Sequence, residues 1–542
     1  MEVTRRSVLS ACADGIMSAA LCTFAVLCLL PWAASAQALP LRHRLLLEAQ
    51  GGAPEQVHLA LGDTRDQIVV SWAEQRTDVP TEVTVSYGRS PDVLDVTVWA
   101  SPGGSVRSYT ALEFYDTDQL RRPDMDNAVF KITEAEIVQA LSTPSFLGTA
   151  PAVQPTAMKP TFGVSANPDN IYASPLLFKV TLHNLEPLTQ YWYRIGRSNI
   201  TRSFKTAPPA APRGFPFTMG VFADVGQSIV SHRIIHHMAS DENTSIVLLA
   251  GDVTYADGLG ARWDAGMRLL EPLASIKPMM ACAGNHEIER GEAWLPFMER
   301  FSMPHVWSGS PSPLQYTFSS GPVQVVVLNT YAGAAGMPRQ AAWLRNVLAS
   351  IDRGATPWVV AMFHAPMYSS LVSKPYSQAG QPMRWALESL LLEYGVDVAI
   401  TGHVHAYERS RPVFNNTLNA CGPVHIGVGD SGAYGGPHTG WHDPQPEWSA
   451  FRSSTFGSGR LAFVNATHAQ WAWTRVACGV TATPKDPDAY WTPVWDNETG
   501  MEGNNCSSTG DATSMAHVRH DDVWIVRDDQ ACANKAKRNL SA

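Results

Sequence analysis

The sequence lacks the two features that most often reveal a nucleic-acid or membrane partner. Its 542 residues carry a formal net charge of −9, and no cluster of lysine and arginine stands out along the chain. We therefore expect no nucleic-acid partner, because such partners are bound by concentrated positive charge. Beyond about residue 41, no apolar run approaches the length needed to cross a bilayer, so we expect no stable membrane partner for the rest of the chain.

Cysteine is also scarce. Three of the eight cysteines lie in the first 36 residues: Cys12, Cys22 and Cys28. Cys282 lies in an apolar run and is most simply a buried free thiol. The remaining four could pair in three ways in an oxidising compartment: Cys421, Cys478, Cys506 and Cys532.

The first 36 residues have the pattern of a secretory signal peptide. Arg5 and Arg6 precede a stretch without charge between Gly15 and Leu41, which contains the small-residue site Ala34-Ser35-Ala36. We expect cleavage after Ala36, so that the mature chain begins at Gln37 in a secreted, secretory-pathway or vesicular compartment. The alternative is an uncleaved membrane signal anchor, because the apolar stretch is almost long enough to span a bilayer.

The sequence contains seven Asn-x-Ser/Thr acceptor patterns, which agree with a secretory route. These candidate glycosylation sites are Asn199, Asn243, Asn415, Asn465, Asn497, Asn505 and Asn539.

The chain beyond residue 36 is longer than one hydrophobic core usually supports, so at least two domains are expected. Residues 37–208 favour an all-β sandwich, because short alternating strands end at Gly, Pro or Asp. These strands are expected at 67–72, 82–87, 178–183 and 191–195. Residues 99–175 interrupt the pattern with a Pro-, Ser- and Thr-rich insertion that contains one helix-like piece near 134–141.

Residues 209–542 have a different pattern, in which short apolar strands alternate with amphipathic helices. This pattern predicts an α/β domain with a largely parallel core sheet. Strands are expected at 217–222, 246–250, 278–283, 323–328, 358–362 and 396–400. Helices are expected after Pro338 and at 382–394, and residues 479–520 form a second insertion that indicates a surface loop.

The predicted strands of the second domain are followed by residues of the types that commonly bind metal ions. Carboxyl ends of strands meet at the edge where α/β folds place their ligands. Five of these ends together supply Asp224, Asp252, Tyr255, Asn285, His286, His364, His403 and His405. Glycines precede Asp252, Asn285 and His403, and we expect them to let the backbone turn sharply toward a common centre.

These donors suit two metal ions. Carboxylate, phenolate and imidazole favour a trivalent, iron-like ion, whereas an amide carbonyl with two imidazoles suits a softer divalent ion. Asp252 has two carboxylate oxygens and could bridge the pair. Two ions about 3.5–4 Å apart form the clamp used for in-line transfer of a phosphoryl group to water.

The set of motifs resembles the purple acid phosphatases of the metallophosphoesterase superfamily. The motifs are Asp224-Val-Gly, Gly251-Asp-Val-Thr-Tyr, Gly284-Asn-His-Glu, His364 and Gly402-His-Val-His. The resemblance extends to 54–59, 364–368, 407–409, 427–430, 456–461 and 465–468. It implies an α/β metallophosphoesterase sandwich domain preceded by an all-β, fibronectin-type-III-like domain.

The resemblance also implies a role for each candidate ligand. A ferric ion would be bound by Asp224, Tyr255 and His405, and one divalent ion (Zn, Mn or Fe(II)) by Asn285, His364 and His403, with Asp252 as the bridge. The Tyr255 phenolate would give the purple colour. Colourless relatives have an Asp-x-His pattern and lack the tyrosine, whereas this chain has Gly226 and Tyr255.

The function implied is an acid phosphatase that hydrolyses small phosphate monoesters by attack of a metal-bound hydroxide. A phosphodiesterase or nucleotide pyrophosphatase on the same scaffold is the alternative enzyme. A surface binding protein with a vestigial site is a third possibility, which the intact ligand motifs disfavour. The physiological ester and the oligomeric state stay open.

One departure from the family concerns the residues around the substrate. Plant members carry two histidines about ten residues beyond the ligand at His364, whereas this chain has Ser373 and Lys374 there. His286 is the nearest motif-anchored group that could protonate a leaving alkoxide, although it could also be a hydrogen-bonding prop. The missing place could be taken by Lys374, His305 or His438.

Overall fold

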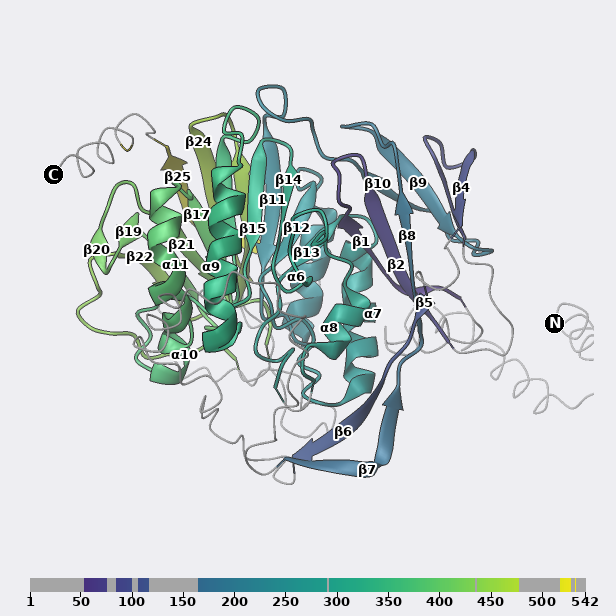
Figure 1. Cartoon of the computed structure of the whole chain (residues 1–542), viewed down its shortest axis with the longest axis horizontal. Coiled ribbons are helices and arrows are strands. Elements are labelled where there is room, and N and C mark those ends of the chain that lie inside the picture. The colour runs from purple at the N-terminus through teal and green to yellow at the C-terminus, as the bar shows by residue number, and fades with distance from the viewer. Residues whose placement is uncertain are drawn as a thin grey trace, which may run out of the picture. The chain divides into compact units, whose positions relative to one another are not determined.

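A computed structural model of the chain describes residues 53–75, 84–99, 106–116, 164–289, 292–433, 436–476, 517–527 and 532 (Figure 1). The chain from Pro54 onward forms one compact unit. The predicted signal peptide, the helix-like piece near 134–141 and residues 479–516 lie outside the described residues. None of the helices in the described part combines the length and apolar character needed to span a bilayer.

The described residues of the N-terminal part form strands and no helix, which confirms the predicted all-β domain. One four-stranded sheet has the order β1 (Glu55–Leu61), β2 (Ile68–Glu74), β8 (Leu176–Leu182) and β5 (Val106–Arg107). The other has the order β10 (Arg202–Lys205), β9 (Gln190–Ile195), β3 (Thr84–Gly88) and β4 (Val96–Trp99). Alternate residues of β9 face a core in which Tyr193 and Ile195 are fully buried.

Strands also form at both ends of the predicted insertion 99–175, where the sequence pattern gives no strand. β5 pairs with β8 and widens the first sheet. β6 (Thr110–Asp116) and β7 (Val164–Ala173) pair with each other as an antiparallel ribbon that extends away from the sheets (Figure 1). A two-stranded ribbon depends on its cross-strand partner, which a single short segment does not reveal.

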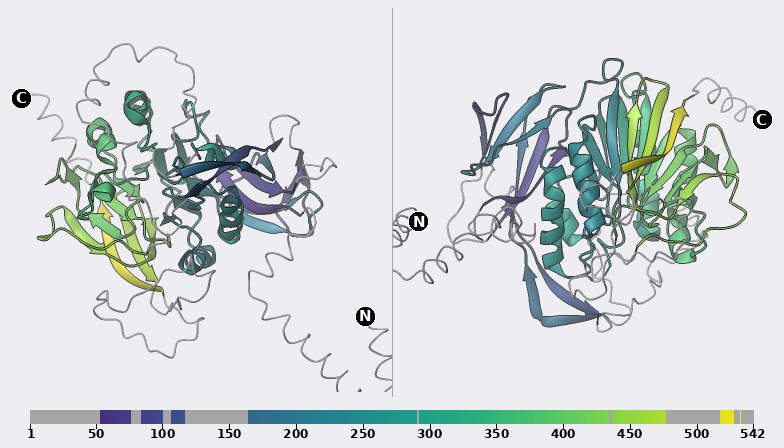
Figure 2. Two further views of the ribbon diagram at one scale, coloured as in Figure 1. Left: turned by 90° about the horizontal axis from the view of Figure 1, so that it is seen from below. Right: turned by 180° about the vertical axis from the view of Figure 1, so that it is seen from behind.

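The second domain contains two mixed sheets, as the expected sandwich requires, and the largely parallel core sheet that the strand pattern predicts is found only in part of each sheet. Its six-stranded sheet has the order β13 (Met279–Ala281), β12 (Ile246–Leu249), β11 (Phe217–Phe222), β23 (Gly457–Phe463), β24 (His468–Val476) and β25 (His517–Val526). The first three strands are parallel and the last three antiparallel, with β25 at the edge (Figure 2). Each predicted apolar strand is present, and β11, β12 and β13 pair in chain order. β11 also pairs with β23, which comes from a distant part of the chain.

The second sheet of this domain contains seven strands. Its order is β14 (Tyr316–Ser320), β15 (Val323–Val327), β16 (Trp358–Met362), β17 (Val398–Thr401), β21 (Val424–Val428), β18 (Tyr407–Ser410) and β22 (Ser449–Ser453). The four strands from β15 to β21 are parallel. A separate two-stranded ribbon joins β19 (Val413–Phe414) to β20 (Thr417–Leu418).

Helices cover the outer faces of the two sheets. They are α6 (Ile229–Ser240), α7 (Gly260–Ala274), α8 (Leu295–Arg300), α9 (Gly333–Ala349), α10 (Lys374–Gln378) and α11 (Gln381–Glu393). The two predicted helices are α9 and α11, although α9 begins before Pro338. Alternation along β15 sends Val326 toward the core beneath α9 and α11, and Val325 and Val327 toward the other sheet. The two sheets therefore pack face to face between layers of helices.

A buried arginine connects the two domains. Arg300, at the end of α8, donates to the Gln56 side chain at 2.6 Å and to Tyr172 and Asp264, both at 2.8 Å. Gln56 and Tyr172 belong to the first domain and Asp264 to the second. The hydrogen bonds of the Arg300 guanidinium therefore hold the two domains together at this point.

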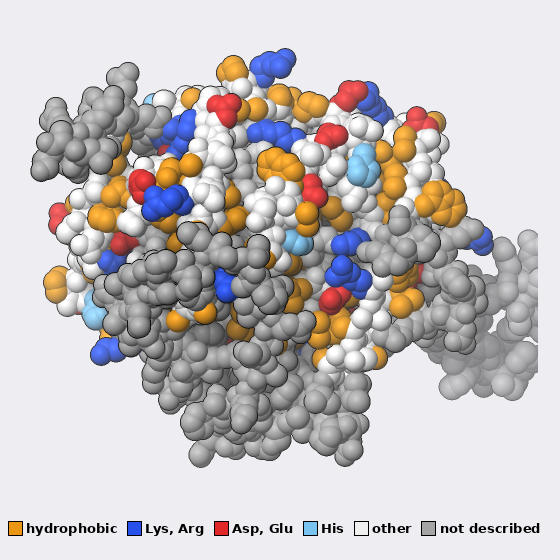
Figure 3. All heavy atoms as spheres, in the orientation of Figure 1, with side chains coloured by type: hydrophobic (Ala, Val, Ile, Leu, Met, Phe, Trp, Pro, Cys, Tyr) orange, Lys and Arg blue, Asp and Glu red, His pale blue; other side chains and the backbone are white. Residues whose placement is uncertain are grey.

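Two features of the sequence have clear outcomes in the structure. Cys282 is a buried free thiol, as predicted, and Cys421 forms a disulfide with Cys532, which is one of the three pairings considered. Cys478 and Cys506 lie outside the described residues. On the face shown in Figure 3, acidic and basic side chains of the described residues are interspersed rather than gathered by sign.

Candidate dinuclear metal site

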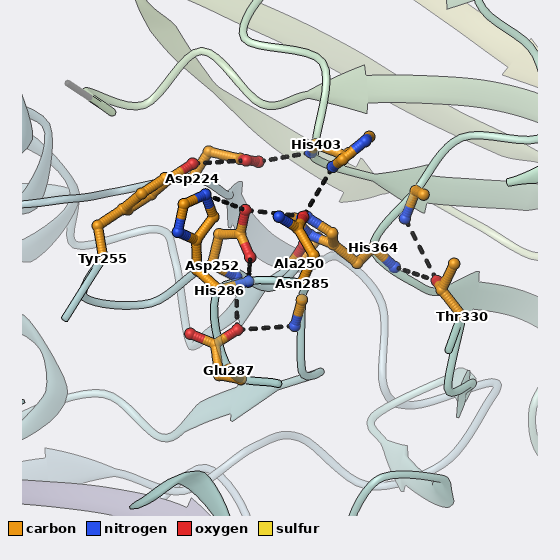
Figure 4. Close-up of polar contacts among 12 residues, drawn as sticks. Asp224, Ala250, Asp252, Tyr255, Asn285, His286, Glu287, Thr330, His364 and His403 are labelled. Carbon is orange, nitrogen blue, oxygen red and sulfur yellow. Dashed lines mark hydrogen bonds and ion pairs between the residues drawn. The ribbon is translucent and has the colours of Figure 1, made fainter. Parts of the chain in front are cut away.

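The loops that follow five strands bring the predicted ligands to one edge of the two sheets. Loops after β11, β12 and β13 of the six-stranded sheet carry Asp224, Asp252, Tyr255 and Asn285. Loops after β16 and β17 of the seven-stranded sheet carry His364, His403 and His405. Figure 4 shows Asp252 between Asp224 and Tyr255 on one side and Asn285, His364 and His403 on the other. Both sheets therefore contribute to one site.

The first group of donors consists of Asp224, Tyr255 and His405. The Tyr255 hydroxyl lies 2.9 Å from Asp224 Oδ1 and 2.8 Å from His405 Nε2. His405 Nε2 in turn lies 3.4 Å from Asp224 Oδ1. A carboxylate oxygen, a phenol oxygen and an imidazole nitrogen thus lie close enough together to bind one metal ion.

The second group consists of Asn285, His364, His403 and Asp252. Asn285 Oδ1 lies 3.1 Å from His364 Nε2 and 2.9 Å from His403 Nδ1. His364 Nε2 also lies 3.1 Å from Asp252 Oδ2. Possible ligand atoms of Asp252, His364 and His403 all lie within 4.8 Å of one another.

These distances fit metal ions at both groups. Ligand atoms about 2.1 Å from an ion lie roughly 3.0–3.4 Å from one another. The distances of 2.8–3.4 Å in the two groups are close to this spacing. The buried Nε2 of His403 has no hydrogen-bond partner among the described residues. All seven residues are between 0 and 7 % exposed, and packing so many charged or polar groups together without cations would be costly.

The pKa shifts of two candidate ligands also favour a site for metal ions. Burial and the neighbouring Asp252 carboxylate raise the pKa of Asp224, against the opposing effect of His364. Burial lowers the pKa of His364, but the carboxylates of Asp252 and Asp224 outweigh it and raise the pKa. Without cations, the raised pKa values of Asp224 and His364 favour their protonated forms. Bound cations would supply the positive charge in place of these protons.

The three glycines that precede ligands have two different roles. Gly251 has a φ of +89°, so it makes the sharp turn that the sequence predicts. Gly284 and Gly402 do not have positive φ, so left-handed backbone is not the reason for glycine there. A Cβ would lie 2.1 Å from Asp252 Oδ1 at Gly284 and 2.3 Å from Asp224 Oδ2 at Gly402. Glycine is needed at these two positions because a ligand carboxylate packs against the backbone.

Four ligands have a backbone conformation that non-glycine residues rarely adopt. The φ angles are 53° for Asp224, 51° for Asp252, 50° for Tyr255 and 67° for His403. Left-handed backbone costs roughly 1–2 kcal/mol per residue, so the surrounding contacts must hold these loops in place. Such strain is typical of functional sites, and it could not be predicted from the sequence motifs.

Glu287 is a functional residue for which the sequence provides no role. Its buried carboxylate accepts the backbone N–H groups of Asp252 and Val253, both at 2.9 Å, and of Gly284 at 2.7 Å. These bonds tie the loop after β12 to the loop after β13 (Figure 4). The motif Gly284-Asn-His-Glu contains the residue, but only the fold shows which amides it reaches.

The ring of His364 is oriented by a backbone carbonyl. His364 Nδ1 donates to the carbonyl oxygen of Ala250 at 2.8 Å, which leaves the Nε2 lone pair facing the second group. The His364 backbone N–H donates to Thr330 Oγ1 at 3.1 Å. The His403 backbone N–H donates to Asp224 Oδ2 at 2.7 Å, so Oδ1 is the oxygen turned toward Tyr255.

His286 lies beside both groups and is paired with a carboxylate that sequence analysis missed. Its Nδ1 is 2.5 Å from Asp257 Oδ1, and its Nε2 is 4.0 Å from Asp252 Oδ2. Burial lowers the pKa of His286, but Asp257 and Asp252 outweigh burial and raise it to about 10. Asp257 follows Tyr255 by two positions, and this closeness to the motif is the only signal for it.

The three candidates for the missing histidine pair have different positions. Lys374 is exposed at the start of α10. His305 Nδ1 is hydrogen bonded to the carbonyl oxygen of Met303, in its own loop. The ring of His438 is stacked on the ring of His405, with centroids 4.4 Å apart and planes inclined by 12°. Of the three, His438 is the one whose ring stacks on a candidate ligand.

Three family profiles match the chain in succession. Residues 54–206 match the purple acid phosphatase N-terminal domain, and residues 217–407 match the calcineurin-like phosphoesterases. Residues 422–483 match the iron/zinc purple acid phosphatase-like protein C family. The metallophosphoesterase fold predicted for the second domain is thus confirmed.

Several curated purple acid phosphatases from plants are similar to the chain. Purple acid phosphatase 18 of Arabidopsis thaliana is 39% identical over 309 residues, which are 56% of this chain and 69% of the relative. The purple acid phosphatase of Glycine max is 34% identical over 352 residues, covering 60% and 75%. The Fe(3+)-Zn(2+) purple acid phosphatase 12 of Arabidopsis thaliana is 35% identical over 327 residues, covering 56% and 69%.

A solved structure supports the fold. The purple acid phosphatase from yellow lupin seeds (Lupinus luteus) superposes with a TM-score of 0.59 at 21% identity, covering 78% of this chain and 72% of that one. Motifs, domain order, strand-end ligands and extent of identity agree, and the chain therefore belongs to the purple acid phosphatase family.

Proposed function

We propose that this protein is an acid phosphatase that hydrolyses small phosphate monoesters at a dinuclear centre of one Fe(III) and one divalent ion. The observation that carries the proposal is the pair of adjacent donor groups with Asp252 between them. Fe(III) is assigned to Asp224, Tyr255 and His405, and one divalent ion (Zn, Mn or Fe(II)) to Asn285, His364 and His403. A relative whose name includes Fe(3+)-Zn(2+) supports this assignment.

The chain's own residues prepare the site for the reaction. When bound, such a pair of ions supplies Lewis acidity and a nucleophile derived from water. Glu287 holds two ligand loops together through three backbone N–H groups, and Ala250 orients His364. Tyr331 donates its hydroxyl proton to Asn285 Oδ1 at 3.2 Å and so orients the amide.

His286 is assigned the role of proton donor to the leaving group. Asp257 fixes the ring through Nδ1, and Nε2 faces the centre at 4.0 Å from Asp252. The nearby carboxylates favour a protonated ring, and a general acid typically contributes about 10²–10⁴ in rate.

Substitution of His286 by Ala tests this role through the choice of leaving group. We expect hydrolysis of alkyl phosphates to slow far more than hydrolysis of nitrophenyl phosphate, because nitrophenolate departs well without protonation. The measurement is kcat/KM for both esters, together with metal content. Equal slowing of both esters at full metal content would contradict the donor role, and loss of metal would indicate a structural prop.

The function itself is tested on the wild-type protein. We expect rapid hydrolysis of nitrophenyl phosphate, slow hydrolysis of bis(nitrophenyl) phosphate and a visible absorption band from Tyr255 bound to iron. Replacement of Tyr255 by Phe should bleach the band while part of the metal remains, because the ring is kept and the phenolate is lost. A colourless wild type that contains iron would contradict the assignment, and preference for the diester would favour a phosphodiesterase or nucleotide pyrophosphatase.

The domain boundaries and the compartment are also proposals. We assign residues 1–36 to a signal peptide, 37–208 to a fibronectin-type-III-like domain and 209–542 to the catalytic domain, in a secreted or vesicular glycoprotein. The described acceptor asparagines are all exposed, as glycosylation requires: Asn199, Asn243, Asn415 and Asn465. Asn497, Asn505 and Asn539 lie outside the described residues.

A further inference from the structure

Two aromatic side chains lie against the imidazole ligands without belonging to either donor group. His438 is stacked on His405, and Tyr376 of α10 lies 4.1 Å from the His438 ring and 5.8 Å from the His403 ring, centroid to centroid. His403 and His405 are 3 % and 7 % exposed, whereas His438 and Tyr376 are both half-buried. Tyr376 and His438 are therefore more exposed to solvent than the two ligands against which they pack.

Two hydrogen bonds join His438 to the backbone of His405, and one of them involves the His438 ring. The His438 N–H donates to the His405 carbonyl oxygen at 2.7 Å, and the His405 N–H donates to His438 Nδ1 at 3.1 Å. Because Nδ1 accepts a hydrogen bond from an amide, the ring proton of neutral His438 must reside on Nε2. The backbone therefore makes Nε2 a hydrogen-bond donor.

The loop that carries His438 is fastened to the segment that follows His364. The Val372 N–H donates to the Gly440 carbonyl oxygen, and the His442 N–H donates to that of Ser370, both at 2.8 Å. The indole N–H of Trp441 donates to Ser454 Oγ at 3.0 Å. The donor is thus presented from a supported loop, as precise contact with a ligand requires.

We propose that His438 is a substrate-binding residue whose Nε2–H donates a hydrogen bond to an oxygen of the bound phosphoryl group, with Tyr376 packed behind its ring. The inference rests on the proposed phosphatase function and adds a contact that the ligand motifs do not include. The ligand class is the phosphate monoester dianion and its product, inorganic phosphate. A hydrogen bond to such a charged oxygen is stronger than one between neutral groups.

The test compares phosphate binding by the metal-loaded wild type and by His438→Ala. Calorimetric titration with inorganic phosphate should show a dissociation constant raised at least about tenfold, the cost of losing a hydrogen bond to a charged group. Both metals should remain, because no ligand is altered. His438→Leu should behave like His438→Ala, since it keeps packing against His405 without a donor, and His438→Gln should recover part of the affinity through its amide N–H.

His442→Ala is the matched control, because His442 is an exposed histidine of the same loop and should bind phosphate as the wild type does. Wild-type phosphate affinity in His438→Ala and His438→Leu, with both metals present, would overturn the proposal. Loss of metal from both variants would also overturn it, because His438 would then be a support for His405. A wild type that holds both metals but neither binds phosphate nor hydrolyses esters would instead refute the proposed function.

Discussion

Asp252→Asn is expected to empty the metal site partly or completely and to remove nearly all phosphatase activity. Asp252 lies between the two donor groups, and its Oδ2 is 3.1 Å from His364 Nε2. Asparagine offers one neutral oxygen where two cations require a bridging negative charge. Loss of a residue that only hydrogen bonds to a metal ligand lowers activity by up to about 100-fold. Because Asp252 would itself bind both ions, we expect the rate to fall by more than this. Elemental analysis and hydrolysis of nitrophenyl phosphate on the same sample measure both effects.

The fold should survive this substitution. Asp252 Oδ1 accepts the His286 backbone N–H at 2.9 Å, and an asparagine carbonyl can accept the same bond. Asp92→Asn, at an exposed aspartate of the first domain, is the control and should change neither metal content nor rate. A variant at Asp252 that keeps both metals and normal turnover would show that this residue is not the bridge.

Glu287→Gln should weaken metal binding although Glu287 contacts no metal. An amide can place only one oxygen among the three N–H donors, so at least one buried N–H loses its acceptor. That loss costs about 1–3 kcal/mol of folding free energy. Loosening the two ligand loops should also weaken metal affinity by about 10- to 100-fold, as for other outer partners.

Competition with a chelator measures this affinity, and thermal unfolding of the metal-loaded protein measures the stability. The control is Glu393→Gln, which removes a surface ion pair with Arg345 in which both side chains are about half exposed, and such pairs contribute little. Unchanged affinity and melting temperature in Glu287→Gln would show that the three amide bonds are dispensable.

The donor groups could be predicted from sequence because each ligand directly follows an apolar strand. Asp224, Asp252 and His403 are marked by short local motifs, and the fold needs only to place parallel strand ends at one edge. Glu287 and Asp257 act on residues about thirty positions away in sequence, as in the pairing of Asp257 with His286. No local pattern encodes such a contact, and the same holds for the left-handed backbone of the ligand loops.

The arrangement of the strands was harder to predict than their existence. The apolar runs at β11, β12 and β16 identify strands, but the antiparallel return of β23 beside β11 depends on residues more than 200 positions apart. Alternation within a strand tells which face is buried and not which strand lies beside it. The strand pattern therefore predicted a largely parallel core sheet, whereas each of the two sheets is mixed.

The origin of the ligands in both sheets has a consequence for folding. In the proposed assignment, the ferric ion takes Asp224 and Tyr255 from loops of the six-stranded sheet and His405 from the seven-stranded sheet. The divalent ion likewise joins Asn285 to His364 and His403. Each ion is then a cross-link between the two layers, so a chain in which only one layer has formed can complete neither coordination sphere. Thermodynamic linkage follows: an ion at 1,000 times its dissociation constant adds about 4.1 kcal/mol to the stability of the docked layers.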